Sequence, residues 1–541
     1  MRSASIHFKE RMMIILQGIT YIHPNRDVLF DDLNLIINKS DKIALIGNNG
    51  AGKSTLLQLL SGQLQTTVGS VTTGSQPYYV PQIFGQFNQH TVAQALNIDH
   101  KLNALHAILE GEVTEENMDT LNDDWTIEER CQEAFAHWKL DIQDLNQPLQ
   151  TLSGGQKTKV FLAGISIHQP EIVLLDEPSN HLDNESREIL YNYISSTKNT
   201  VLIVSHDRIL LNLLDNIFEL SKRGITIYGG NYDFYTEQKQ IEAEALNQAL
   251  KSQEKALRKA KETERQSLER QQKLDARGKR KQEKSGVPTI FMNTLRNNAE
   301  NSSSKIKGVH AEKVSSISKE LGSLRKEQPD IDQMKMGFDN AALPLGKVLI
   351  TANSINFAYG DKVLWKAALN FQISSGERIA IEGPNGSGKS TLIKLILSGL
   401  QPQSGNIKTV SLNSVYIDQH YSLIHNELSV YEQAQHFNSG VLQEHEVKIR
   451  LNRFLFDKTY WDKPCRALSG GEKMRLMLCC LTITNLAPDM IILDEPTNNL
   501  DIQNIEILTA ALNEYRGTLL LVSHDSLFLR EINVERSIIL S

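Results

Sequence analysis

The chain has 541 residues, of which 40% are hydrophobic and 22% charged, and its formal net charge is −7. At ~100–200 residues per domain, this length predicts three or four structural units. No stretch approaches the ~20 apolar residues that a membrane-spanning helix needs, and the apolar run 12–16 is too short for a signal-peptide core, so we expect a cytoplasmic protein. The four cysteines form no CxxC motif and have no cluster of histidines nearby, which favours buried free thiols over a zinc or iron–sulfur site.

The first element in chain order is a glycine-rich loop between a predicted strand, 43–46, and a predicted helix, 55–60. In this context the loop is a P-loop, whose backbone N–H groups surround a β-phosphate at a helix N-terminus. Its lysine would lie near the β- and γ-phosphates, and the serine that follows offers a hydroxyl to Mg²⁺. The predicted ATP-binding residues of this loop are Gly47, Asn48, Asn49, Gly50, Ala51, Gly52, Lys53, Ser54 and Thr55.

Three catalytic positions and one metal-binding position follow the P-loop. Gln82 comes after an aromatic-bearing strand, and Asp176 and Glu177 end the apolar run 172–175, which predicts a buried parallel strand. We expect Asp176 to hold Mg²⁺, Glu177 to orient and polarise the attacking water, and Gln82 to reach both. His206 ends a third strand and is placed to hydrogen-bond a γ-phosphate.

The same ordered set returns later in the chain. A single P-loop match carries a real false-positive risk, but the complete set, present twice, predicts ATP binding at two competent sites. The predicted fold class is α/β, with two P-loop nucleotide-binding domains joined by a long α-helical hairpin. The second set consists of Gly383, Pro384, Asn385, Gly386, Ser387, Gly388, Lys389, Ser390 and Thr391, then Gln419, Asp494, Glu495 and His524, with Ser390 and Asp494 as the Mg²⁺ ligands.

The spacing of the two copies locates an insertion. Lys53 and Lys389 are 336 residues apart, whereas Ser153 and Ser469 are 316 apart, so the first copy holds about 20 extra residues. They are expected near 108–129, a stretch rich in Glu and Asp. We interpret it as a helical arm, with an irregular acidic loop as the alternative.

A basic segment separates the copies. Residues 251–326 contain 20 Lys/Arg against 9 Asp/Glu, a net charge of +11. The rest of the chain therefore has a net charge of −18. Residues 241–284 have a strong helix composition, and a 3-4-3 apolar seam at Val314, Ile317, Leu321 and Leu324 predicts a second helix antiparallel to the first. The hairpin tip would fall within 284–304, where Ile290, Phe291 and Met292 are apolar. The alternatives are an ordinary spacer and a solvated helix surface.

The runs Leu152-Ser-Gly-Gly-Gln and Leu468-Ser-Gly-Gly-Glu, together with the P-loops and the Leu-Asp-Glu-Pro runs, resemble the ATP-binding cassette superfamily. The resemblance implies that the two cassettes pair head to tail, so that Lys53 shares a nucleotide with Ser469, and Lys389 with Ser153. It also implies that Tyr359 stacks on adenine in the second copy, where the first copy has His23. The residues that it adds to the two ATP sites are Ser153, Gly154, Gly155, Tyr359, Ser469, Gly470 and Gly471.

Within that superfamily the chain is most similar to the ABC-F proteins, on the tandem cassettes, the long charged linker and the run Leu175-Asp-Glu-Pro-Ser-Asn-His-Leu-Asp183. The second copy has Asn499 in place of the histidine. This resemblance implies a ribosome-binding ATPase, whose basic linker contacts rRNA and reaches towards the P-site tRNA and the peptidyl-transferase centre. We expect a monomer with a first domain over 13–236, a linker over 237–346 and a second domain over 347–541.

Other functions compete with this interpretation. The main alternative is the ATPase subunit of an ABC transporter, for which the basic linker has no evident use. A DNA-repair or cluster-carrying recycling ATPase would need a cysteine-rich module, and a scaffold with dead cassettes conflicts with the intact glutamates. Within ABC-F, a general translation factor competes with ribosome protection against antibiotics. The long tip and the expected lack of a C-terminal extension after His524 favour protection.

Overall fold

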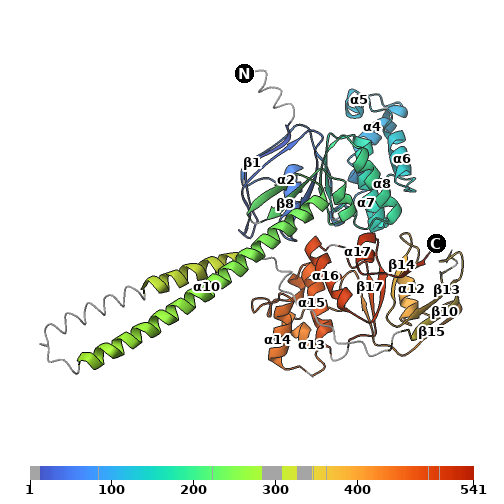
Figure 1. Cartoon of the computed structure of the whole chain (residues 1–541). Helices are drawn as coiled ribbons and strands as arrows, with labels where there is room; N and C mark the ends of the chain where they lie inside the picture. Colours follow the sequence, from blue (N-terminus) through green and yellow to red (C-terminus); the bar gives the residue numbers. More distant parts are fainter. Residues whose placement is uncertain are drawn as a thin grey trace, which may run out of the picture. The chain divides into compact units, whose positions relative to one another are not determined.

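The computed structural model describes residues 12–540, apart from 83, 222, 283–307, 326–343, 345, 361, 441, 485–486 and 499. Its contacts divide the chain into two compact units. One unit comprises Met1–Tyr235 with Met334–Ser541 and carries both copies, and the other is Thr236–Gln333 (Figure 1). The predicted hairpin tip, 284–304, lies outside the described residues.

The first copy alternates strands with helices after an antiparallel beginning. In chain order its elements are β1 (Met12–Ile22), β2 (Val28–Asn38), β3 (Lys42–Ile46), α2 (Lys53–Leu60), β4 (Val68–Thr73), β5 (Tyr78–Val80), η1 (Gly85–Phe87), α3 (Val92–Ala95), α4 (Asp99–Leu109), α5 (Glu115–Leu121), α6 (Ile127–His137), η2 (Leu149–Thr151), α7 (Gly154–His168), β6 (Ile172–Asp176), α8 (Asn184–Ser196), β7 (Thr200–Val204), α9 (Arg208–Asn212), β8 (Asn216–Ser221) and β9 (Gly224–Tyr228).

The second copy repeats this order. Its elements are β10 (Val348–Asn356), β11 (Ala358–Tyr359), β12 (Lys362–Val363), β13 (Leu369–Ser374), β14 (Arg378–Glu382), α12 (Lys389–Ile396), β15 (Ser404–Thr409), β16 (Ser414–Ile417), α13 (Val430–Phe437), α14 (Glu444–Arg453), η4 (Cys465–Ala467), α15 (Gly470–Ile483), β17 (Met490–Asp494), α16 (Ile502–Glu514), β18 (Thr518–Val522), α17 (Ser526–Glu531) and β19 (Arg536–Ile539).

Each copy is built on a sheet that is mainly parallel. Among the described residues, the order is β5-β6-β7-β3-β8-β9 in the first copy and β16-β17-β18-β14-β19 in the second. Every pair is parallel except β8 with β9. Along β3, Ile43 and Leu45 belong to one core and Ala44 and Ile46 to another. The sheet is therefore buried on both faces, which is why its strands are apolar throughout.

This strand order brings the functional loops together. The P-loop follows β3, His206 follows β7, Asp176 ends β6, and Gln82 follows β5. These are four neighbouring strands, and their carboxyl ends lie on one edge of the sheet, where ligands bind in open α/β folds. The second copy has the same arrangement on β14, β18, β17 and β16.

The acidic segment near 108–129 forms the end of α4, helix α5 and the start of α6. Two isolated bridges, Thr91 with Pro148 and Ser429 with Pro464, mark equivalent positions in the copies. Between the second pair lie α13 and α14, whereas the first pair encloses α3 to α6. Among the described residues, the first copy therefore has more helices between its two bridge positions than the second copy has.

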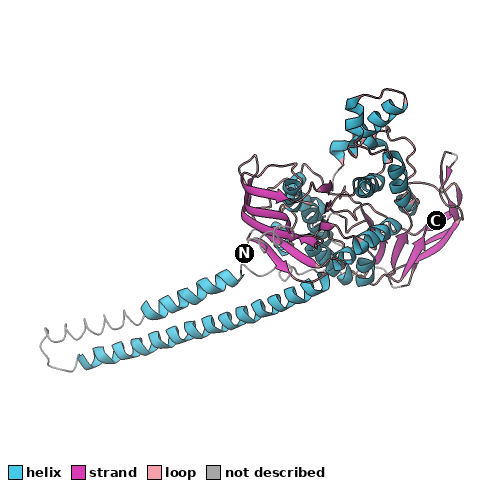
Figure 2. Ribbon diagram, turned by 90° about the horizontal axis from the view of Figure 1, so that it is seen from above, coloured by secondary structure: helices cyan, strands magenta, loops and turns pink. Residues whose placement is uncertain are grey.

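The segment between the copies contains two long helices. Helix α10 spans Tyr232–Gln282, and a second helix covers 308–325. The two lie side by side in both views (Figures 1 and 2). Leu250 and Leu321 are buried, and Arg325 donates to Glu254 over 2.7 Å. Helix α10 begins nine residues before the predicted start at 241, because the Asn231 side chain accepts the N–H of Phe234 and caps the first turn.

Candidate nucleotide sites

Each glycine-rich loop ends at a glycine that caps the following helix. Gly52 caps α2 with φ 95°, and Gly388 caps α12 with φ 90°. Few side chains adopt this left-handed conformation, and a Cβ on Gly52 would lie 2.6 Å from the ring of Phe30. The first N–H groups of α2 and α12 have no acceptor within their helices, so each loop offers hydrogen-bond donors to an anion.

The P-loop lysines lie inside their own loops. The ammonium of Lys53 donates to the carbonyl of Gly47 over 2.7 Å, and that of Lys389 donates to Gly383 over 2.8 Å. Burial lowers the pKa of both ammonium groups, and the nearby carboxylates oppose that shift, with Glu177 as the largest opposing charge at Lys53. The hydrogen bonds to the loop carbonyls hold each lysine ammonium group inside its P-loop.

The aspartates at the ends of β6 and β17 lie among oxygen groups. Tyr79 donates to Oδ2 of Asp176 over 3.2 Å, and Tyr416 and Ser390 donate to Oδ2 of Asp494 over 3.0 and 3.3 Å. Burial raises the pKa of both aspartates. Among the described residues, Oδ1 of Asp176 is buried without a partner. Carboxylate and hydroxyl oxygens suit Mg²⁺, and the candidate ligands are Ser54, Asp176, Ser390 and Asp494.

The next residue in each copy is a buried glutamate. Glu177 and Glu495 are each 7% exposed, and burial raises their pKa to about 8 and about 7, respectively. Nε2 of His206 lies 3.2 Å from Oε1 of Glu177, and Nε2 of His524 lies 3.4 Å from Oε1 of Glu495. Burial lowers the pKa of His524 to about 3 and that of His206 well below its usual value, so both rings are neutral at pH 7.

The serines of the Leu-Ser-Gly-Gly runs are helix caps. Ser153 accepts the N–H of Gln156 over 3.3 Å, and the Gln156 side chain accepts the N–H of Ser153 over 2.9 Å. Ser469 and Glu472 make the same reciprocal pair at the start of α15. A serine followed three residues later by Gln or Glu is a capping box, so a local sequence signal explains this geometry.

Two cavities contain most of the predicted site residues. The first, of about 380 Å³, is lined by His23, Leu29, Asn49, Gly50, Gly52, Lys53, Ser54, Thr55, Gln82, Asp176, Glu177, Val204, His206 and Ser469. The second, of about 530 Å³, is lined by Ser153, Gly154, Gly155, His181, Leu182, Arg187, Tyr359, Leu364, Asn385, Gly386, Gly388, Lys389, Ser390, Thr391, Gln419, Asp494, Glu495, Asn498 and His524. Each cavity therefore contains the P-loop of one copy and the capping serine of the other.

The remaining predicted residues lie beside the cavities. The carbonyl of Ser387 accepts from Trp365 over 2.9 Å, which anchors the second P-loop to the antiparallel part of its copy. The predicted residues that do not line either cavity are Gly47, Asn48, Ala51, Gly383, Pro384, Ser387, Gly470 and Gly471. At the adenine position, His23 lines the first cavity and Tyr359 the second.

Several known proteins are similar to this chain. A family model described as ABC transporter matches residues 30–180 and 367–498. The putative ATP-binding protein YdiF of Bacillus subtilis is 30% identical over 94% of this chain and 77% of its own length. ABC transporter F family member 5 of Arabidopsis thaliana is 29% identical over 93% of this chain and 71% of its own length.

This chain is an ABC-F protein of the ATP-binding cassette superfamily. Its fold is also similar to a solved structure of the archaeal ribosome recycling factor aABCE1 in complex with the archaeal ribosomal stalk protein aP1. That likeness has a TM-score of 0.57 and 18% identity, and it covers 96% of this chain and 87% of the other. Within the part of this ABC-F chain that the structure describes, no helix combines the length and apolar character needed to cross a membrane.

Residues that sequence reasoning did not assign complete the sites of this ABC-F protein. The N–H of Asn49 donates to Oδ2 of Asp501 over 3.0 Å, and the Asn385 side chain donates to the carbonyl of His181 over 2.8 Å. Asp183 and Asp501 cap α8 and α16, and each ends a run that begins Leu-Asp-Glu-Pro. An Asp before a helix signals a cap, but no local pattern shows that it also contacts the opposite P-loop.

Proposed function

We propose that this chain hydrolyses ATP at two composite sites and uses the reaction to control its binding to the ribosome. The observation that carries the proposal is the sharing of each cavity. Ser469 of the second copy lines the cavity of the first P-loop, and Ser153 of the first copy lines the other. A nucleotide bound in either cavity would be held by both copies, so binding favours their pairing and hydrolysis releases it.

In this proposal each P-loop binds the phosphates through its N–H groups and its lysine. The candidate oxygen ligands would hold Mg²⁺, which offsets the phosphate charge. Glu177 and Glu495 orient the attacking water, with Gln82 and Gln419 beside them in the same cavities. His206 and His524 would hydrogen-bond the γ-phosphate, the N-termini of α7 and α15 would contact it from the opposite copy, and Tyr359 would stack on adenine.

The ribosome enters the proposal through charge and family. Residues 251–326 carry 20 basic against 9 acidic side chains, and a dense positive charge favours a phosphate-rich RNA. The similarly folded aABCE1 is named as a ribosome recycling factor. In this proposal the linker contacts rRNA and the P-site tRNA near the peptidyl-transferase centre, and the protein acts as a monomer with domains over 13–236, 237–346 and 347–541.

Protection against antibiotics is the second role that we keep within this proposal, because the predicted tip, 284–304, is longer than a tight turn requires. In that role Phe291 or Met292 would act near a drug-binding region. The competing function, an ABC transporter ATPase, is consistent with the description of the matching family model. Co-sedimentation in ATP distinguishes the two functions, since one predicts ribosomes in the pellet and the other membranes.

The double variant Glu177→Gln with Glu495→Gln tests the central claim. Gln keeps the shape of Glu but cannot accept a proton, so the variant should bind ATP normally and lose at least ~100-fold of its turnover. It should remain on ribosomes in ATP and stop peptide synthesis. The measurements are phosphate release, ATP affinity and ribosome pelleting.

The matched control replaces two exposed glutamates, Glu188→Gln with Glu514→Gln, and should leave all three measurements unchanged. Normal turnover in the first double variant would remove both glutamates from the mechanism. If the first double variant binds ATP without hydrolysing it but does not remain on ribosomes, the ATPase part of the proposal stands and the ribosomal part is overturned.

A further inference from the structure

The two copies differ at the start of the helix that follows each Leu-Asp-Glu-Pro run. Helix α8 begins at Asn184 after its cap Asp183, and α16 begins at Ile502 after its cap Asp501. Counted from the caps, Asn184 corresponds to Ile502. One turn further on, Arg187 of the first copy corresponds to Ile505 of the second. Polar residues in one copy thus stand where the other copy has two isoleucines.

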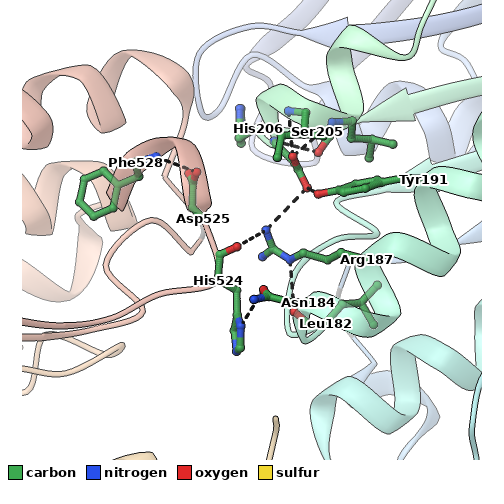
Figure 3. Close-up of polar contacts among 12 residues, drawn as sticks. Leu182, Asn184, Arg187, Tyr191, Ser205, His206, His524, Asp525 and Phe528 are labelled. Atoms are coloured by element: carbon green, nitrogen blue, oxygen red, sulfur yellow. Dashed lines mark hydrogen bonds and ion pairs between the residues drawn. The ribbon is translucent and has the colours of Figure 1, made fainter. Parts of the chain in front are cut away.

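At the second site these polar residues contact the histidine of the opposite copy (Figure 3). Oδ1 of Asn184 lies 3.1 Å from Nδ1 of His524, and Nη1 of Arg187 donates to the carbonyl of His524 over 3.4 Å. Nε2 of the same ring lies 3.1 Å from the ammonium of Lys389. The ring and the backbone of His524 are therefore both held by residues of α8.

Arg187 is itself fixed in place. Its Nε donates to the carbonyl of Leu182 over 3.2 Å, and its Nη1 lies 3.6 Å from Oδ2 of Asp207. Asp207 accepts a 2.6 Å hydrogen bond from Tyr191 and follows His206 directly in the chain. Figure 3 shows the guanidinium between the loops that carry the two histidines. A planar, fixed donor of this kind keeps its geometry at low entropic cost.

The first site lacks the equivalent contacts among the described residues. Nδ1 of His206 is buried without a hydrogen-bond partner there. Ile505 is 1% exposed, and Ile502 packs against the apolar core of the first copy. Neither isoleucine side chain has a polar atom to offer to the ring or to the carbonyl of His206.

We infer that Asn184 and Arg187 are positioning residues which the first copy supplies to the second ATP site, where they orient His524, and that the first site works without a counterpart. This inference rests on the proposed ATP hydrolysis. It makes the two sites inequivalent, since hydrolysis at the second site requires α8 of the opposite copy to be in place.

The physical basis is orientation of a neutral ring. An amide beside Nδ1 accepts from Nδ1–H in one tautomer and, turned over, donates to Nδ1 in the other, so Asn184 holds the ring plane in both. A misplacement of ~1 Å at a reacting group costs ~100-fold in rate. Removing both contacts should therefore slow the second site strongly. The first site should be slowed much less, because there Arg187 contacts Asp207 and not the histidine ring.

The test gives the first copy the residues of the second, as Asn184→Ile with Arg187→Ile. The pair is placed in a Glu177→Gln protein, where the second site keeps its glutamate, and in a Glu495→Gln protein, where the first site does. We expect kcat to fall by ~10-fold or more in the Glu177→Gln protein and by a much smaller factor in the Glu495→Gln protein. Arg187→Lys, which keeps a charged donor, should restore part of the loss.

Exposed Glu188 lies on the same helix, and Glu188→Gln should change neither rate. Equal losses in the two proteins, or a loss that follows a lowered thermal unfolding midpoint, would overturn the inference in favour of a structural role. Complete loss of hydrolysis from both single-Gln proteins would show that the sites act as one and would also overturn it. A wild-type chain without ATPase activity would instead overturn the proposed function.

Discussion

Glu177 and Glu495 combine an unusual backbone with an unusual side-chain environment. Their φ angles are 50° and 49°, in the left-handed region that most residues avoid at a cost of ~1–3 kcal/mol. The strain is held by the next strand, because the N–H of Glu177 donates to Val204 and that of Glu495 to Val522, each over 2.8 Å. These turns end the strands and leave each carboxylate at the edge of the sheet, inside a cavity.

Gly155 offers a test at the scale of a single residue. A Cβ at this position would lie 2.6 Å from the carbonyl of His181 and 3.1 Å from the side-chain amide nitrogen of Asn385 in the other copy. Gly155→Ala should therefore crowd His181 of its own copy and displace Asn385 of the other copy at the second site, and it should lower ATP turnover by ~10-fold, about 1.4 kcal/mol. Gly322→Ala, at an exposed helical glycine that has no positive φ and no neighbour within 4 Å, is the matched control. Normal turnover of Gly155→Ala would mean that the copies do not approach this closely during hydrolysis.

At the scale of elements, the helices α4 to α6 are joined by one carboxylate. Asp124, between α5 and α6, accepts from Arg130 over 2.7 and 2.9 Å and from Lys101 of α4 over 2.8 Å. The Arg130 hydrogen bonds, and then those of Lys101, lower the pKa of Asp124 to about 2, although burial opposes them. The additional helices of the first copy are thus held together by charge as well as by apolar packing.

We expect Asp124→Asn to destabilise these helices by ~1 kcal/mol at pH 7, a modest value because solvent screens the ion pairs. Since the folded pKa lies below the ordinary value, the contribution of the carboxylate is complete above about pH 4 and disappears as pH falls towards 2. Hydrogen exchange over residues 99–137 should therefore differ between variant and wild type at pH 7, and the difference should shrink near pH 3. Asp119→Asn, at an exposed position on α5, is the control. A difference that grows in acid would contradict this assignment.

At the scale of the whole molecule, an ion pair joins the copies away from the nucleotides. Arg208, the first residue of α9, contacts Glu531, the last residue of α17, with N–O distances of 2.5 and 3.0 Å. The Arg208 side chain is 11% exposed and that of Glu531 40%. Both helices directly follow the loops that carry the site histidines, so this pair and the nucleotides favour the same arrangement of the copies.

Charge reversal tests that arrangement. Arg208→Glu and Glu531→Arg each place like charges together and should lower ATP turnover by about 5–10-fold, which corresponds to ~1–1.4 kcal/mol. The combined variant recreates the pair in the opposite direction and should recover to within about twofold, measured as turnover against ATP concentration. Arg530→Glu, an exposed neighbour on α17, should have little effect. If the turnover of the combined variant is reduced by the product of the two single-variant factors, the two residues act independently and the pair does not form in the active state.

The amino-acid sequence by itself determined the repeat, the two P-loops, the residues at the ends of the apolar strands and the helical composition of the linker. These features depend on neighbouring residues, since a glycine cap, a capping box or a buried parallel strand is encoded within a few positions. The tertiary structure alone decided that Asp501 contacts Asn49, and that Asn184 and Arg187 contact His524. It also decided that Ile502 packs against the apolar core of the first copy. The contacts with Asn49 and His524 join segments more than 300 residues apart, and they depend on how the two copies pair, which no local pattern encodes.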